Sequence, residues 1–324
     1  ITTTGFRTVD RFRTSLSSLG TWTEDQATDS PDEFASSFKL TCTTADSSPA
    51  AGDVAYIRYM FEGNELQGLA YGASSAKDMT LSFWVKSNKT GSATVQLLQN
   101  DNSSKNLSPS YTISSADTWE YKTISIPADT AGSIDNDNGP AVSLIWWLNS
   151  GSNYSSGSNQ TTWSTYSATD SNASNLGVGG ATSDYFAITG VQLEVGDTAT
   201  PFEHRSYGEE LAFCQRYCTR FPHVNTSYEY AQIASGMAAT GTISFFPLTL
   251  PVSMRAAPTL TASGTWRVYN GGTLNLTQGL ALTSSTNTHV SIKGTTGDVL
   301  TIKDAVLLTQ NNDFNANLLF EAEL

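Results

Sequence analysis

Alternation along the predicted strands places a set of aromatic and hydrogen-bonding side chains on the polar sides of those strands: Tyr56, Arg58, Trp84, Lys86, Gln96 and Trp147. A flat indole or phenol ring packs against the apolar C–H face of a sugar, while guanidinium and amide groups hydrogen-bond its hydroxyl rim. If these strands share one sheet, the side chains form a carbohydrate-binding surface. The candidate carbohydrate-binding residues are therefore Trp84, Trp147, Tyr56, Arg58 and Gln96. Alternatively, Trp84 and Trp147 pack under a loop or in a subunit interface.

Patterns for catalysis are incomplete in this sequence. It contains no HExxH, P-loop or GxSxG motif, and Gly177-Val178-Gly179-Gly180 lacks the final glycine spacing of a dinucleotide-binding loop. A carboxylate pair for glycoside hydrolysis could still come from the acidic residues, of which there are 30. We expect a protein that is not an enzyme.

Patterns for metal binding are equally incomplete. Cys214, Cys218 and His223 have suggestive spacing, but a structural zinc site needs four ligands and no fourth is apparent. In 135–139, which resembles a calcium loop, Gly139 and the following Pro140 occupy positions where that motif needs an oxygen ligand and a glycine. The sequence therefore predicts reduced thiols, a polar turn, and no cofactor.

The elements that must position the candidate residues are short strands. Segments 54–61, 79–86, 93–99, 118–126, 142–149 and 185–195 are bounded by Ser, Asn, Gly, Asp or Pro. In Met79–Lys86 the odd positions are apolar, and Trp146 shares a face with Leu144 and Leu148, which makes it a core residue. Successive strands without helices predict an antiparallel sandwich over about residues 1–200.

The stretch from Asn149 to Asp184 is unusually long for a loop and is rich in Ser, Asn, Thr, Gly and Tyr. Such a mixture is typical of binding loops, in which aromatic rings give rigid contact area and small polar residues adapt. The alternative is a solvated excursion without function.

A second region follows a turn-rich link at Gly196–Arg205. Ser206 and Glu209 have the spacing of a capping box, and apolar residues recur at helical spacing up to Phe221. These features predict one linking amphipathic helix over about 206–221, with β patterning again from Tyr228 onward. We therefore divide the chain into a domain at 1–200 and a second at 201–324, the latter comprising the helix and a smaller β-sandwich.

Composition limits the partners. Lys and Arg total 17 against 30 Asp and Glu, which gives a net charge of −13 and repels phosphate backbones and anionic lipid headgroups. No run approaches the roughly 20 apolar residues of a membrane span, and no signal-peptide pattern is present. We expect no nucleic acid and no membrane insertion. Among glycans, the acidic surface favours neutral or cation-bridged ones over strongly anionic ones.

Several stretches resemble one family. The clearest are Ile188–Gly196 (ITGVQLEVG), Ala199–Arg205 (ATPFEHR) and Glu210–Tyr217 (ELAFCQRY), with weaker ones at 81–87, 118–120, 251–259 and 322–324. In these the chain is similar to tail-fibre and related virion fibre proteins of marine and cyanobacterial phages. The resemblance implies an N-terminal jelly roll like that of carbohydrate-binding modules, a smaller C-terminal β domain, a homotrimer, and a place on the virion surface. It also allows a structural calcium ion.

These observations leave competing functions open. The first is a tail or head fibre component that binds host-surface glycan and contacts itself and other virion proteins. The second is a structural decoration or connector protein, in which Trp84 and Trp147 are buried between chains. The third is a depolymerase, which would release reducing ends from a host polysaccharide.

Overall fold

The computed structural model describes residues 1–101, 104–222, 230–271, 274–297 and 300–324. Its internal contacts divide the chain into two compact units, Ile1–His204 and Arg205–Glu323. Both consist mainly of β-strands, with short helices at η1 (Gly63–Leu69), α1 (Ser152–Ser155), η2 (Ala168–Asp170) and α2 (Tyr207–Gln215). The all-β class predicted from the alternating patterns is confirmed. None of the described helices combines the length and the apolar character needed to cross a membrane.

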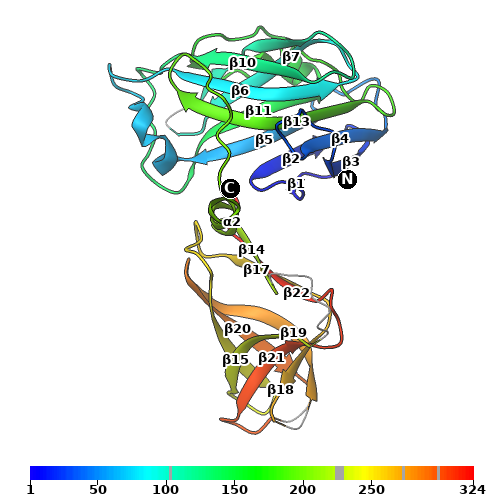
Figure 1. Ribbon diagram of the computed structural model, residues 1–324, viewed down its shortest axis with the longest axis vertical. Coiled ribbons are helices and arrows are strands. Elements are labelled where there is room, and N and C mark those ends of the chain that lie inside the picture. The colour runs from blue at the N-terminus through cyan, green and yellow to red at the C-terminus, as the bar shows by residue number, and fades with distance from the viewer. Residues whose placement is uncertain (102–103, 223–229, 272–273, 298–299) are drawn as a thin grey trace. The chain divides into compact units, whose positions relative to one another are not determined.

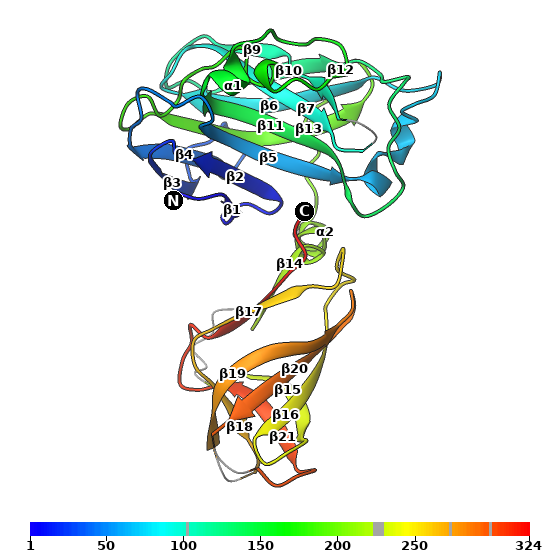
Figure 2. The same cartoon turned by 180° about the vertical axis from the view of Figure 1, so that it is seen from behind.

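The N-terminal unit contains a larger and a smaller antiparallel sheet (Figures 1 and 2). The larger sheet runs in the order β1 (Gly5–Phe6), β2 (Phe12–Ser17), β5 (Val54–Glu62), β11 (Pro140–Ser150), β7 (Gly91–Gln99), β8 (Lys105–Leu107) and β12 (Ser164–Thr165), with β9 (Ser110–Ile113) also paired to β7. The smaller sheet runs in the order β10 (Glu120–Ile126), β6 (Met79–Ser87), β13 (Tyr185–Val195), β4 (Ser37–Thr44) and β3 (Thr21–Ala27).

The chain passes repeatedly from one sheet to the other, as in a jelly roll. The inner faces of the sheets bury one apolar core, in which Trp146 of β11 and Phe83 of β6 have no exposed surface and their ring centroids lie 5.8 Å apart. The prediction that Trp146 is a core residue is confirmed. Since alternate residues point to opposite faces, Trp147 must point outward from the same strand.

The C-terminal unit combines a closed barrel with a small separate sheet. The barrel order is β15 (Gln232–Ala238), β16 (Ile243–Thr249), β20 (His289–Thr296), β19 (Leu274–Ser285), β18 (Trp266–Tyr269) and β21 (Ala305–Gln310). The separate sheet, β14 (Cys218–Phe221), β22 (Asn317–Glu321) and β17 (Thr259–Ser263), lies at one end of the barrel (Figures 1 and 2). The sequence predicts a sandwich for this unit, whereas these six strands form a barrel. Because the barrel is closed, both edge strands of its sheet are paired.

Helix α2 begins where the sequence predicts and ends earlier. The Ser206 hydroxyl accepts from the Glu209 N–H, and the Glu209 carboxylate accepts from the Ser206 N–H, which forms the predicted capping box. The helix ends at Gln215 rather than near 221, because Cys218–Phe221 pairs with β22. Cys214 therefore lies in α2 and Cys218 in β14, so the two do not share one helix. His223 lies outside the described residues.

A buried carboxylate ties the segment before β11 to the larger sheet. Asp129 is 4% exposed and accepts hydrogen bonds from Lys105 Nζ at 2.7 Å, Gln99 Nε2 at 2.7 Å and the Gly132 N–H at 2.9 Å. Burial alone would raise the pKa of Asp129, but Lys105, the Ala131 N–H, Gln99 and the Gly132 N–H together hold the pKa below its usual value.

This pKa shift predicts an acid-sensitive stability. A carboxyl with a lowered folded-state pKa stabilises the fold above its unfolded-state pKa and loses that contribution as pH falls through the folded value. We therefore expect Asp129→Asn to flatten the dependence of unfolding free energy on pH between about pH 5 and pH 2. Urea unfolding across that range measures this, with Asp25→Asn, at an exposed position on β3, as the control. An unchanged slope in Asp129→Asn would contradict the assignment.

Candidate functional site

The outer face of the larger sheet brings together four of the five candidate residues. Cross-strand partners point to the same face of a sheet. One register row joins Arg13 of β2, Arg58 of β5, Ile145 of β11 and Gln96 of β7, and the adjacent row joins Ser15, Tyr56 and Trp147. The predicted side chains Tyr56, Arg58, Gln96 and Trp147 therefore lie on one surface, together with Arg13.

Trp147 lies beneath this surface rather than on it. Its side chain is 3% exposed, because the rings of Tyr56 and Tyr154 pack on it at centroid distances of 4.8 and 5.6 Å. Its Nε1–H donates to Gln96 Oε1 at 2.9 Å. Trp147 thus supports Tyr56 from below, and a ligand meets the Tyr56 ring before it can meet the indole.

Gln96 is also covered, by the long segment that the sequence leaves open as a binding loop or a solvated excursion. Its side chain is 1% exposed, and its Nε2 donates to Asn106 Oδ1 at 2.7 Å and to Ser171 Oγ at 3.2 Å. Ser171 and Tyr154 belong to the segment between β11 and β13. That segment packs on the sheet and closes the Gln96 end of the outer face.

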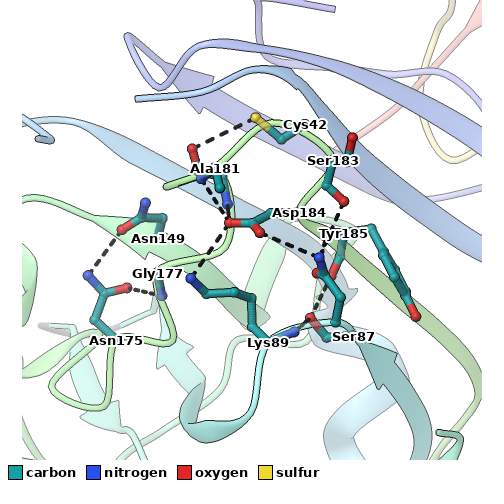
Figure 3. A network of polar contacts seen from close by, with 12 residues as sticks. Cys42, Ser87, Lys89, Asn149, Asn175, Gly177, Ala181, Ser183, Asp184 and Tyr185 are labelled. Atoms are coloured by element: carbon teal, nitrogen blue, oxygen red, sulfur yellow. Dashed lines mark hydrogen bonds and ion pairs between the residues drawn. The ribbon is translucent and has the colours of Figure 1, made fainter. Parts of the chain in front are cut away.

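A polar network fixes the end of this covering segment (Figure 3). Asp184, 4% exposed, accepts hydrogen bonds at Oδ2 from the backbone N–H groups of Gly179 at 3.1 Å and Ala181 at 3.0 Å. Lys89 Nζ lies 3.7 Å from the same oxygen. Asn175 Nδ2 donates to Asn149 Oδ1 at 3.1 Å. These contacts hold the C-terminal end of the segment against the sandwich.

The half-buried side chains of Tyr56, Arg58, Arg13 and Phe6 form what we call the open row, the part of the outer face that stays accessible. Arg58 lies directly opposite Arg13 across β5 and β2, and Arg13 Cζ lies 5.9 Å from the centroid of the Phe6 ring. Burial, and then the Arg13 charge, lower the pKa of the Arg58 guanidinium, whereas Tyr56 raises it. Sequence reasoning missed Arg13, although the alternation Phe12-Arg13-Thr14 could have placed it on the outer face.

Trp84 lies on the other sheet and does not join these residues. On β6 it pairs with Tyr121 of β10 and Thr189 of β13, and the Trp84 and Tyr121 rings lie 5.3 Å apart. Tyr121 is 43% exposed. Lys86 on the same strand forms an ion pair with Asp29 at 2.8 Å. The condition that all candidate residues share one sheet is therefore not met for Trp84 and Lys86. Strand alternation does not reveal which sheet a strand enters.

Metal ligands do not gather in the described residues, where no group of three or more His, Cys, Asp or Glu side chains could hold an ion. Segment 135–139 forms a turn, in which Asp137 Oδ1 accepts from the Gly139 N–H at 2.8 Å. Asn64 Nδ2 donates to Asn138 Oδ1 at 2.7 Å, which ties the turn to η1. The predicted polar turn is confirmed.

No protein-family model and no curated protein sequence matches the chain. Among solved structures, it is similar to the enzymatically active domain of tailspike protein 4 of bacteriophage CBA120, with 14% identity and a TM-score of 0.33 over 57% of this chain and 19% of that one. It is also similar to a family 11 carbohydrate-binding module of Clostridium thermocellum, with 14% identity and a TM-score of 0.31 over 58% and 90%. A third is the CBM22-2 xylan-binding domain of Paenibacillus barcinonensis Xyn10C, with 13% identity and a TM-score of 0.30 over 57% and 92%.

Proposed function

We propose that this chain is a non-catalytic fibre component of a phage virion that binds carbohydrate on the host surface through the open row. The observation that carries the proposal is the half-buried Tyr56 ring beside the guanidinium groups of Arg58 and Arg13 on one face of a sheet. The ring supplies an apolar platform for the C–H face of a sugar, and the guanidinium groups donate to its hydroxyl rim.

The packing of Trp147 beneath Tyr56 favours a role for Tyr56 in sugar binding over a role as an ordinary surface residue. Trp147 packs against Tyr56 and is itself fixed by Gln96, so the tyrosine ring has little freedom left to lose when a sugar stacks on it. A shallow face of this kind gives weak single-site affinity. Several copies on one virion would multiply that affinity by a factor on the order of 10² to 10⁴. The proposed homotrimer on the virion surface would supply several such copies of the binding face.

A glycan array probed with the assembled full-length protein tests the proposal. We expect binding to at least one glycan and its loss in Tyr56→Ala, because the stacking platform is removed. Phe314→Ala is the matched control, since it removes an aromatic side chain that is 54% exposed in the other unit. Absence of glycan binding by the assembled wild type, or binding that survives Tyr56→Ala, would overturn the proposal for this face.

A second candidate location is favoured by the Trp84–Tyr121 pair, in which a partly exposed indole adjoins a tyrosine on the smaller sheet. Trp84→Ala in the same array distinguishes the two faces: loss of binding there, with Tyr56→Ala unchanged, would move the glycan site to the smaller sheet. If the chain is instead a structural decoration or connector protein, neither substitution should change glycan binding, and a map of the particle should show both faces buried against neighbouring subunits.

If the chain is instead a depolymerase, it should release reducing ends from a host polysaccharide.

A further inference from the structure

The open row breaks a general rule of sheet design. Arg13 and Arg58 occupy directly opposite positions on β2 and β5, where like charges destabilise a sheet and opposite charges would stabilise it. Within the described ranges neither guanidinium forms an ion pair, whereas Arg7, Arg11 and Arg205 each lie within 4.0 Å of a carboxylate. The pairing therefore costs stability. Among the described residues the contact of Arg13 with the Phe6 ring offsets part of this cost, but no carboxylate neutralises either charge.

A second observation shows that this cost extends to hydrogen bonding. The Nε of Arg58 is buried and has no hydrogen-bond partner among the described residues. A buried donor of a charged group that stays unpaired costs more than an exposed one, because water cannot replace the missing acceptor. Places where a sequence breaks local rules without compensation within the fold are often functional sites.

We propose that the sugar bound at the open row carries an anionic group, a carboxylate or a sulfate, and that Arg58 and Arg13 bind this group together. The inference rests on the proposed carbohydrate-binding function and names its substrate class. One anion between the two guanidinium groups removes their mutual repulsion and accepts hydrogen bonds from both. Tyr56 in the adjacent row and Phe6 beside Arg13 then supply the apolar contacts to the ring that bears the anion.

This inference reverses the expectation from composition, which favours neutral glycans. The net charge of −13 repels a polyanion from the molecule as a whole. That repulsion makes the test more informative, because an acidic protein has no general attraction for anionic polymers. A preference for them must come from a local cluster of positive charge such as Arg13 and Arg58.

The test compares polymers that differ only in charge. Binding of the assembled full chain is measured by interferometry with dextran sulfate against dextran, and with polygalacturonate against its methyl ester. We expect at least one anionic polymer to bind more tightly than its neutral partner. Arg58→Gln and Arg13→Gln should each weaken that binding by about 10- to 100-fold, as expected for hydrogen bonds to a charged group. Preference within the dextran pair identifies sulfate, and preference within the pectin pair identifies a carboxylate.

Controls separate this inference from the function on which it rests. Arg7→Gln removes one positive charge from the same unit outside the open row and should leave binding unchanged. Arg58→Gln should not lower the melting temperature, because it removes a repulsion and an unpaired buried donor. If neutral polymers bind as well as anionic ones, with affinity lost in Tyr56→Ala but kept in Arg58→Gln and Arg13→Gln, the anion inference fails and the binding function stands. If no glycan binds, both fail.

Discussion

Trp147→Ala is expected to lower the free energy of unfolding of the N-terminal unit by about 3 to 5 kcal/mol, as replacement of a buried tryptophan usually does. The indole is 3% exposed, lies under the rings of Tyr56 and Tyr154, and donates its Nε1–H to Gln96. Its removal leaves a cavity under Tyr56 and an unpaired acceptor on a buried glutamine. Urea unfolding of the full chain, followed by circular dichroism, measures the loss.

The variant Trp147→Phe separates the two contributions. It keeps an aromatic ring under Tyr56 but removes the donor to Gln96 Oε1, so we expect it to cost about 1 to 2 kcal/mol, the amount typical of one buried hydrogen bond. A Trp147→Ala protein as stable as wild type that no longer binds glycan would contradict this account. Trp147 would then contact the ligand directly, as the sequence alone suggests.

The contrast between Trp146 and Trp147 shows how much the sequence can predict. Alternation within Val142–Asn149 assigns Trp146 to the core and Trp147 to the opposite face, and both assignments hold in the structure. Which face of the sheet a side chain points to depends only on the two-residue period of the strand, and this period can be read from the local sequence. Whether an outward residue meets solvent depends on what covers the face, and here the covering residue Tyr154 comes from the segment between β11 and β13.

Sheet membership is the second limit. Trp84 on β6 and Trp147 on β11 have the same local pattern, but β6 pairs with β10 and β13 while β11 pairs with β5 and β7. These partners come from distant parts of the chain. The same limit explains the length of α2: apolar spacing up to Phe221 fits a helix, but pairing of Cys218–Phe221 with β22 prevails. Antiparallel pairing over so long a separation has no signature in a single local window.

The open row was only half predicted for a related reason. Tyr56 and Arg58 lie on a strand with clear alternation, whereas Arg13 lies on the short β2, in a part of the chain not predicted as a strand. The feature that distinguishes this face is the direct opposition of Arg13 and Arg58, which arises from the register between β2 and β5. The sequence pattern of each strand taken alone does not give this register, so it could not predict that the two arginines lie opposite each other.

Gly179→Ala is expected to lower the free energy of unfolding by about 3 kcal/mol or more, the sum of backbone strain and overpacking. Gly179 has a φ of +94°, and a Cβ there would lie 2.5 Å from Cζ2 of Trp22. Trp22 cannot yield, since it is 1% exposed and its Nε1–H donates to the Leu19 carbonyl at 2.7 Å. The Gly179 N–H is held by Asp184, so the backbone cannot retreat without loss of that bond. Thermal and urea unfolding measure the effect.

Gly177→Ala is the matched control, because it lies in the same segment with a φ of +70° and would meet no atom within 4 Å. Its cost should be limited to the left-handed backbone, about 1 to 2 kcal/mol. The difference between the variants then isolates the contact with Trp22. Equal losses would show that backbone strain alone selects glycine in Gly177-Val178-Gly179-Gly180. A larger loss at Gly179 would show that close packing against Trp22 requires the glycine there, in a stretch whose spacing only partly resembles a dinucleotide-binding loop.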